Sequence, residues 1–222
     1  YKLVVARKGM AIGQVNVTGK AAHAGVAHDQ GANAILQLAE TVQQLAAVTD
    51  YDKNITLNVG TIAGGTVTNR VPHAASARFE MRAFTPPVFD TAMTQIEAVN
   101  GRGGVTAVSS AYTCEVDVEI FNVTQPWADN DDSRRLLAIF GEAAGEVGLS
   151  VVPEARGGLS DGNHLWHLVP TLDGLGPAGG NAHCSERSSD GSKDQEFVDV
   201  TSFVPKTLLN VAGVMRLVAD SD

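Results

Sequence analysis

Hydrophobic residues recur at every second position in four stretches of the first half of the chain, and at helical spacing in two others. The first spacing is typical of a strand with one buried face, and the second of an amphipathic helix. The order across residues 11 to 121 is strand, helix, strand, strand, helix, strand. This order predicts a ferredoxin-like βαββαβ sheet with two helices on one face. The predicted strands are 14–18, 55–59, 75–81 and 114–120, and the predicted helices are 33–48 and 86–99.

After residue 121 the pattern changes to helices that alternate with short apolar segments. Helical spacing covers 136–147 and a closing helix from about residue 202 to 218, while VVPEA and VPTLDGLG have the apolar character of short strands. This alternation predicts an α/β layer, so the fold class combines α+β and α/β parts. We place a domain boundary near residue 121, with residues 10–121 as one domain and residues 1–9 and 122–222 as the other.

Composition narrows the possible functions. The 222 residues are 44% hydrophobic and 18% charged, which is typical of a globular protein with a packed core, and no run approaches the ~18 apolar residues of a membrane span. The net charge is −9, with the negative excess concentrated in residues 122–222, which argues against binding to a nucleic-acid backbone. Two cysteines are too few for a disulfide framework, and they favour reducing surroundings and hence a cytoplasmic over a periplasmic location.

Three histidine segments are candidates for chemistry, and each has a plainer alternative. His23 in TGKAAHAGVAH lies among small residues between a strand and a helix, so it is either a surface histidine or a functional one. His164 and His167 are spaced to chelate a metal on one helix face, but the leucines and tryptophan around them favour packing. His183 in GGNAHCSERSSD is flanked by glycines that allow close approach of the backbone, which suits a metal ligand or a solvated loop.

Two further polar residues are candidates for substrate binding. Arg82 is predicted on the polar face of its strand, where its guanidinium could bind a carboxylate with two hydrogen bonds or simply face solvent. Asn69 in GGTVTNRVP suits a turn equally well. Because the chain has no GxSxG motif, no P-loop and no dinucleotide fingerprint, the sequence gives no support to a serine nucleophile or a nucleotide site.

Four motifs together resemble a known family: TGKAAHAGVAHDQGANAILQLAE, NVGTIAGGTVTNRVPHAASARFEMR, GGLSDGN and LDGLGPAGGNAH, in this order. They look like the co-catalytic zinc metallopeptidases that include carboxypeptidase G, aminoacylase, acetylornithine deacetylase and succinyl-diaminopimelate desuccinylase. The resemblance implies that residues 10–121 form a βαββαβ lid that also makes a homodimer. Residues 1–9 and 122–222 would then form the C-terminal portion of an α/β catalytic domain.

The resemblance also implies roles for individual residues. His23 would reach the active site of the partner subunit and polarise the scissile carbonyl. Asn69 and Arg82 would bind a peptide or N-acyl amino acid, with Arg82 holding its terminal carboxylate. Gly158 and Ser160 of GGLSDGN would line the substrate pocket.

His183 matches the last ligand of a centre that holds two zinc ions per active site. The other ligands of the family come from a His-x-Asp motif, a Glu-Glu pair whose first member is the general base, and a further acid, and neither motif occurs in this sequence. We therefore expect that the chain is the later part of a longer enzyme, and that alone it has no peptidase activity and binds zinc poorly.

The resemblance favours a carboxypeptidase that releases a C-terminal amino acid such as glutamate. Two alternatives stay open: an N-acyl amino acid amidohydrolase of the same family, and a non-catalytic dimerisation module whose site residues are relics.

Overall fold

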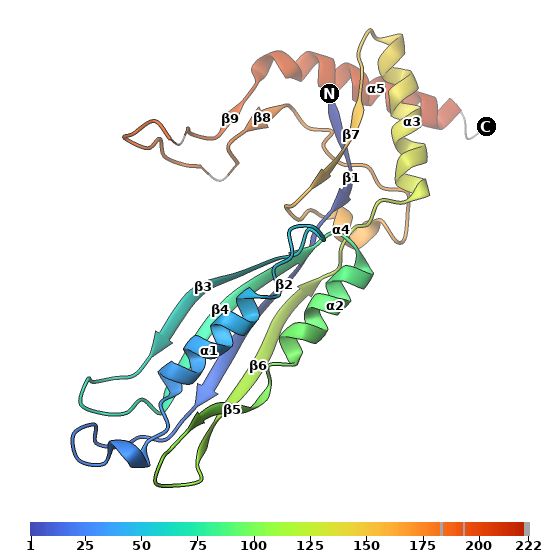
Figure 1. The fold of residues 1–222 in the computed structure, drawn as a ribbon. Helices are drawn as coiled ribbons and strands as arrows, with labels where there is room; N and C mark the ends of the chain where they lie inside the picture. Colours follow the sequence, from blue (N-terminus) through green and yellow to red (C-terminus); the bar gives the residue numbers. More distant parts are fainter. Residues whose placement is uncertain (183, 193, 220–222) are drawn as a thin grey trace. The chain divides into compact units, whose positions relative to one another are not determined.

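The computed structural model describes residues 1–182, 184–192 and 194–219, which form two compact units (Figure 1). The sheet unit comprises Arg7–Ala128 and Gly157–His164. The terminal unit comprises Tyr1–Ala6, Asp129–Arg156 and the described residues from Leu165 onward.

The sheet unit is built on one five-stranded antiparallel sheet with the strand order β3-β4-β2-β6-β5. Helix α1 connects β2 to β3, and β4 lies between these two strands in the sheet. Helix α2, followed by the edge strand β5, connects β4 to β6, and β2 lies between these two. This is the arrangement of a ferredoxin-like fold, so the predicted fold class is confirmed. The elements are β2 (Gly9–Thr18), η1 (His28–Gln30), α1 (Ala34–Ala46), β3 (Thr56–Gly64), β4 (Ala74–Ala83), α2 (Pro86–Glu97), β5 (Gly101–Thr106), β6 (Thr113–Thr124) and α4 (Gly162–Leu165).

The edge strand β5 is absent from the predicted elements. Its sequence, GRGGVT, contains three glycines and therefore shows no alternation of apolar side chains. The strand is defined instead by its pairing with β6 and by the side chain of Gln37 in α1, whose Oε1 accepts a hydrogen bond from the Val105 backbone N–H at 2.9 Å. Gly103 is needed there because a Cβ atom would lie 2.2 Å from the same oxygen.

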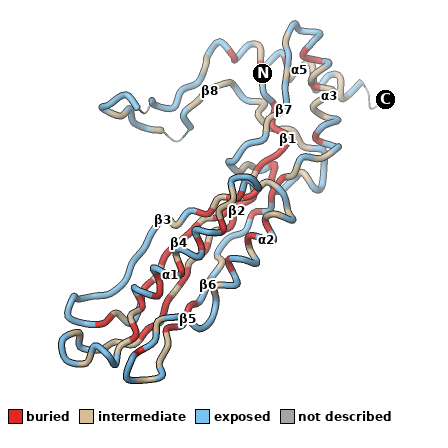
Figure 2. Tube along the Cα trace, viewed as in Figure 1, coloured by how far each residue is buried: buried red, intermediate tan, exposed pale blue. Residues whose placement is uncertain are grey.

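The core of the sheet unit lies between the sheet and the two helices α1 and α2, which cover one face (Figures 1 and 2). Strand β4 shows the division clearly: Phe79, Met81 and its three odd-numbered alanines are buried, and the even-numbered residues lie on the other face. The predicted alternation of β4, with Arg82 on the polar face, is therefore confirmed. We call this uncovered side of the sheet the open face.

The terminal unit contains β1 paired with β7, the short pair β8 and β9, and the packed helices α3 and α5. Leu3, Phe140, Ala144 and Leu209 form its core. Helices α3 and α5 can approach closely because Gly213 has no side chain. A Cβ atom at this position would lie 2.5 Å from the Phe140 ring. The bounds are β1 (Lys2–Arg7), α3 (Asp131–Glu146), β7 (Val152–Arg156), β8 (Gly179–Gly180), β9 (Phe197–Val198), η2 (Val200–Ser202) and α5 (Phe203–Ala219).

The strand expected in VPTLDGLG does not form, so that prediction is wrong. The segment makes a single bridge, in which the backbone groups of Val4 and Asp173 exchange hydrogen bonds of 2.7 and 3.0 Å. Gly174 follows with φ +76°, which turns the chain out of the extended conformation. Among the described helices, none is long and apolar enough to cross a membrane.

Helix α1 begins at a side-chain cap that gives a test of the fold. Asn33 Oδ1 accepts hydrogen bonds from the backbone N–H groups of Ile35 and Leu36 at 2.9 and 3.3 Å. We predict that Asn33→Ala lowers the free energy of unfolding of the sheet unit by about 0.5–2 kcal/mol, because both N–H groups lose their acceptor. Urea denaturation followed by circular dichroism measures this change. The exposed Gln44→Ala on the same helix is the control and should change stability little; equal effects would contradict the cap.

Candidate functional site

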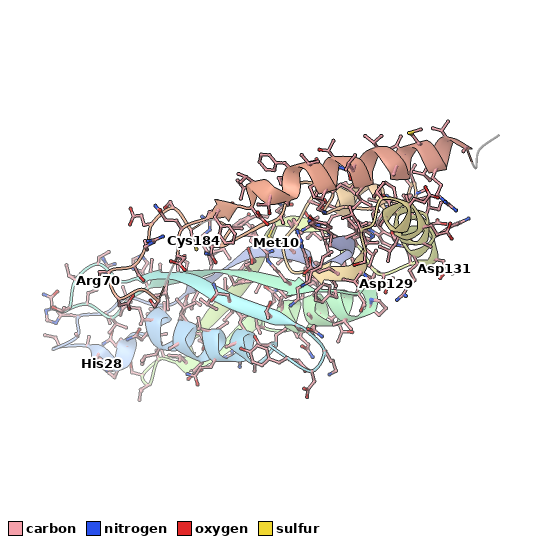
Figure 3. All side chains as sticks on the ribbon, turned by 90° about the horizontal axis from the view of Figure 1, so that it is seen from above. Met10, His28, Arg70, Asp129, Asp131 and Cys184 are labelled. Carbon is pink, nitrogen blue, oxygen red and sulfur yellow. The ribbon has the colours of Figure 1, made fainter. Side chains whose placement is uncertain are left out.

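The described candidate residues form two groups at opposite ends of the antiparallel pair β2–β4. Met10 lies opposite Arg82 at one end of this pair, and Thr18 lies opposite Ala74 at the other. Because a strand rises about 3.3 Å per residue, the two ends are roughly 25 Å apart. Figure 3 shows the same separation, with Met10 far along the sheet from His28 and Arg70.

At the first end, which we call the Arg82 end, the guanidinium group of Arg82 is held by three partners. Its Nε and Nη2 atoms donate to the two carboxylate oxygens of Glu80 at 2.6 and 3.2 Å. Its Nη1 donates to the Gly157 carbonyl at 2.8 Å, and Nη2 also lies 3.7 Å from the Met10 sulfur. Strand β4 thus presents Arg82 to the GGLSDGN loop, whose residues Gly158 and Ser160 are predicted from the family resemblance to line the substrate pocket.

The GGLSDGN loop is fixed to the sheet unit by a buried asparagine. Asn163 is 2% exposed, and its Nδ2 donates to the backbone carbonyls of Lys8 and Gln125, both at 3.1 Å. Its Oδ1 accepts from the backbone N–H of Ser160 at 3.1 Å, and the Ser160 hydroxyl accepts from the Gly162 N–H at 3.2 Å. The position of Ser160 therefore depends on Asn163.

Two further residues hold the same loop. Arg7, which is buried, donates from Nη1 to the Gly158 carbonyl at 2.7 Å. Gly162 packs so closely on the fully buried Trp127 that a Cβ atom would lie 2.5 Å from the indole ring. Sequence reasoning missed these contacts, although Gly162 and Asn163 lie within the quoted motif.

A second cationic side chain, Lys8, lies at the Arg82 end. Burial, followed by the neighbouring charge of Arg82, lowers the pKa of the Lys8 ammonium from its ordinary value. The Lys8 ammonium also lies 5.3 Å from the centre of the Phe84 ring, a cation–π contact. Lys8 and Arg82 thus bring two positive groups to this end, where the carboxylate of Glu80 pairs with one of them, Arg82.

The second group, which we call the His23 end, brings His23 and Asn69 together. The Ala24 N–H donates to the Asn69 carbonyl at 2.9 Å, and His23 forms a β-bridge with Arg70. Both side chains are exposed and line one pocket of about 410 Å³. Nδ1 of His23 accepts from the Gly25 N–H at 3.2 Å, so in the neutral imidazole the proton sits on Nε2, which is left to donate.

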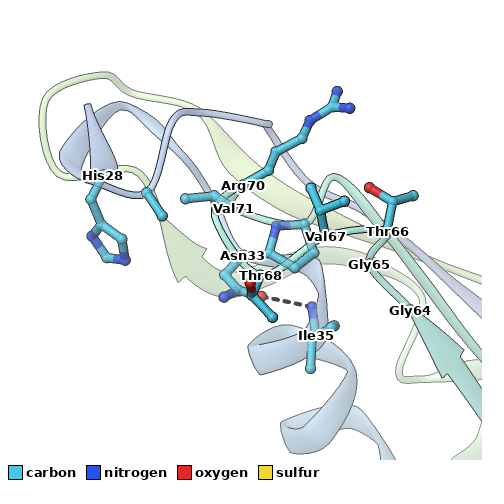
Figure 4. A pocket seen from close by; sticks show the side chains of 12 residues that line it. His28, Asn33, Ile35, Gly64, Gly65, Thr66, Val67, Thr68, Arg70 and Val71 are labelled. Atoms are coloured by element: carbon cyan, nitrogen blue, oxygen red, sulfur yellow. Dashed lines mark hydrogen bonds between the residues drawn. The ribbon is translucent and has the colours of Figure 1, made fainter. Parts of the chain in front are cut away.

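A larger pocket of about 520 Å³ adjoins the His23 end, between the start of α1 and the turn after β3 (Figure 4). It is lined by Ile35 and Val67 and by the polar side chains of His28, Asn33 and Arg70. The pocket contains no carboxylate, and its apolar side chains suit contact with another polypeptide more than metal chemistry.

The described residues do not form a zinc site. No group of three or more His, Cys, Asp or Glu side chains in residues 1–182, 184–192 and 194–219 is placed to hold a metal ion. Structural and catalytic zinc sites use about three or four protein ligands. His183 lies outside the described residues, so its predicted role as a ligand stays a prediction.

Comparison with known proteins identifies the sheet unit. Residues 5–106 match the peptidase dimerisation domain of the M20 peptidases. Carboxypeptidase G2 from Pseudomonas sp. is 29% identical over 226 residues, which cover 99% of this chain and 49% of that protein. Succinyl-diaminopimelate desuccinylase from Burkholderia ambifaria is 26% identical over 209 residues, which cover 91% of this chain and 51% of that protein. Aminopeptidase PepT from Bacillus cereus has the same fold, with a TM-score of 0.75 over 98% of this chain and 54% of that one at 23% identity.

The chain is therefore related to the M20 peptidases and carries their dimerisation domain, which confirms the family resemblance of the sequence motifs. Its relatives are hydrolases of that family. The chain spans about half the length of the curated relatives it matches.

The close packing of the loop on Trp127 gives a prediction. Gly162→Ala should lower the free energy of unfolding by about 1–3 kcal/mol, because the added methyl group overlaps the indole ring. Gly157→Ala, in the same loop, is the matched control, since a Cβ atom there meets nothing within 4 Å. Urea titrations followed by tryptophan fluorescence compare the two variants. Equal stability of both would show that the loop does not pack on Trp127.

Proposed function

We propose that this chain is part of a metallopeptidase that hydrolyses the amide bond next to a C-terminal amino-acid carboxylate, as a glutamate carboxypeptidase does. The family relationship supports a hydrolase, and the carboxypeptidase among the relatives covers nearly the whole chain. The guanidinium group of Arg82, which has donors beyond those paired with Glu80, supports recognition of a carboxylate there. In this proposal Arg82 binds the terminal carboxylate, and Gly158 and Ser160 line the substrate pocket.

The observation that carries the proposal is the separation of the two groups of candidate residues. His23 and Asn69 lie roughly 25 Å along the sheet from Arg82, which is too far for one substrate to contact both ends of the same chain. We therefore propose that each active site combines the Arg82 end of one copy with the His23 end of a second copy. His23 would donate from Nε2 to the carbonyl oxygen on which negative charge develops, and Asn69 would bind the same substrate.

A homodimer that joins the two ends requires an interface on the sheet unit. Strand β3 is an edge strand, because its one neighbour in the sheet is β4, and an unpaired edge can pair with another chain. Apolar side chains are exposed beside this edge: Ile35 and Leu36 at the start of α1, Ile62 on β3 and Val67 in the following turn. We propose that this surface, continuous with the pocket of Figure 4, forms the homodimer contact, in agreement with the match to a dimerisation domain.

Zinc enters the proposal through the family relationship alone. His183 would contribute one ligand, and the remaining ligands of the two zinc ions would come from residues that this sequence does not contain. When bound, such ions lower the pKa of a coordinated water and polarise the carbonyl group.

The desuccinylase relative favours a second candidate function, hydrolysis of an N-acyl amino acid. Both substrates carry a carboxylate next to the amide bond, so Arg82 serves either one. A non-catalytic dimerisation module is the third candidate, because the family model that matches residues 5–106 is that of a dimerisation domain.

A mixing experiment tests the divided active site. In the complete product of the reading frame that encodes this chain, we predict that His23→Ala and Arg82→Ala each lower kcat/KM on N-acyl or peptidyl glutamate by about tenfold or more. When the two variants are mixed and allowed to exchange subunits, about a quarter of the wild-type rate should return, because half of the dimers then contain one intact site. The double variant Arg82→Ala/His23→Ala, mixed with itself, is the control. Failure of the mixture to recover activity would contradict the division of the site between two copies.

The chain by itself gives a simpler prediction. With zinc added, the purified 222-residue polypeptide should not hydrolyse N-acyl or peptidyl glutamate, because the described residues cannot hold the metal. Turnover that follows the chain through purification, and that chelation of the metal abolishes, would contradict this prediction.

A further inference from the structure

The two edges of the Arg82 guanidinium group are used differently. The edge formed by Nε and Nη2 is taken by the carboxylate of Glu80, in a two-point ion pair. The edge formed by Nη1 and Nη2 is taken by the neutral carbonyl of Gly157 and by the Met10 sulfur, which is a weak acceptor. A carboxylate that arrives from outside therefore meets weak competition on the second edge alone.

We propose that the Gly157 carbonyl oxygen occupies the place of one substrate carboxylate oxygen, and that a bound substrate displaces it. Glu80 is then a positioning residue, because it holds the first edge and leaves the second one for the substrate. This inference rests on the proposed role of Arg82, and it adds Glu80 and the start of the GGLSDGN loop to the carboxylate site.

The strengths of the competing bonds support the displacement. A hydrogen bond between two charged groups is roughly twice as strong as one between neutral groups, so a carboxylate on Nη1 and Nη2 outcompetes a carbonyl and a thioether. Glu80 is not displaced, because it is itself a carboxylate with two bonds to the guanidinium group.

The loop can release Gly157 without losing its other contacts. Gly157 is exposed, and a Cβ atom built on it meets nothing within 4 Å, so its peptide group has room to rotate. The next residues are held independently, Gly158 by Arg7 and Ser160 by Asn163. Substrate binding therefore changes the loop at Gly157 while the pocket-lining residues stay in place.

The test is an NMR titration of the full 222-residue chain with N-acetyl-L-glutamate. The ¹³C shift of the Gly157 carbonyl reports its hydrogen bond, and the Nε signal of Arg82 reports binding. On saturation of the wild type, the Gly157 signal should move to the position of a carbonyl that has lost its bond to Arg82. Arg82→Ala should show that position without ligand and should not respond. Arg78→Ala removes another arginine of the open face, which stacks 5.3 Å from the Phe121 ring, and should behave as the wild type.

Glu80→Ala separates positioning from a general loss of structure. This variant frees the Nε and Nη2 edge, so the ligand should still bind while the Gly157 carbonyl no longer responds. The displacement of Gly157 is contradicted if the wild type binds the ligand through Arg82 and the Gly157 signal does not move. It is also contradicted if Glu80→Ala still shows the Gly157 response. In both cases the proposed binding of a carboxylate by Arg82 is unaffected. If the wild type binds no ligand, or if Arg82→Ala binds it equally well, the proposed role of Arg82 in binding the carboxylate is wrong.

Discussion

The pairing of β2 with β4 is the constraint on which the rest of the sheet unit depends. Its register runs unbroken from Gly9 opposite Ala83 to Thr18 opposite Ala74. A slip of one residue would turn Arg82 into the core and Met81 out to solvent, because side chains alternate between the two faces of a strand. Burying that arginine without its partners would cost free energy, and this cost fixes the register. The register in turn places the Arg82 end and the His23 end at opposite ends of the β2–β4 pair.

Much of this fold could be predicted from the sequence, because its core alternates regularly. Strands β2, β3, β4 and β6 and helices α1 and α2 each bury one face, and that burial appears as a period in the apolar residues. Strand β5 has no such period, since glycines fill it and its pairing with β6 determines it. VPTLDGLG has the composition of a strand but lacks the continuous pairing that would make it one, so local pattern alone predicted it wrongly.

The candidate site was predictable as a set of residues but not as an arrangement. The motifs named Arg82, Gly158 and Ser160, yet the contacts of Asn163 with Lys8 and of Arg7 with Gly158 join residues more than 150 positions apart. No local pattern carries that information, because it arises when the loop returns to the base of the sheet. The same holds for Glu80, whose position on the strand is evident from the sequence while its two bonds to Arg82 are not.

The central claim is that one active site needs the two opposite ends of two copies. Its most direct measurement is the distance between spin labels at residue 69 of one protomer and residue 158 of another, with Cys184 replaced by serine so that it takes no label. A mixture of the two singly labelled proteins, in the complete gene product, should give an intermolecular distance clearly shorter than the roughly 25 Å between the ends within one chain. A mixture that shows only longer distances, or none between protomers, would contradict the account.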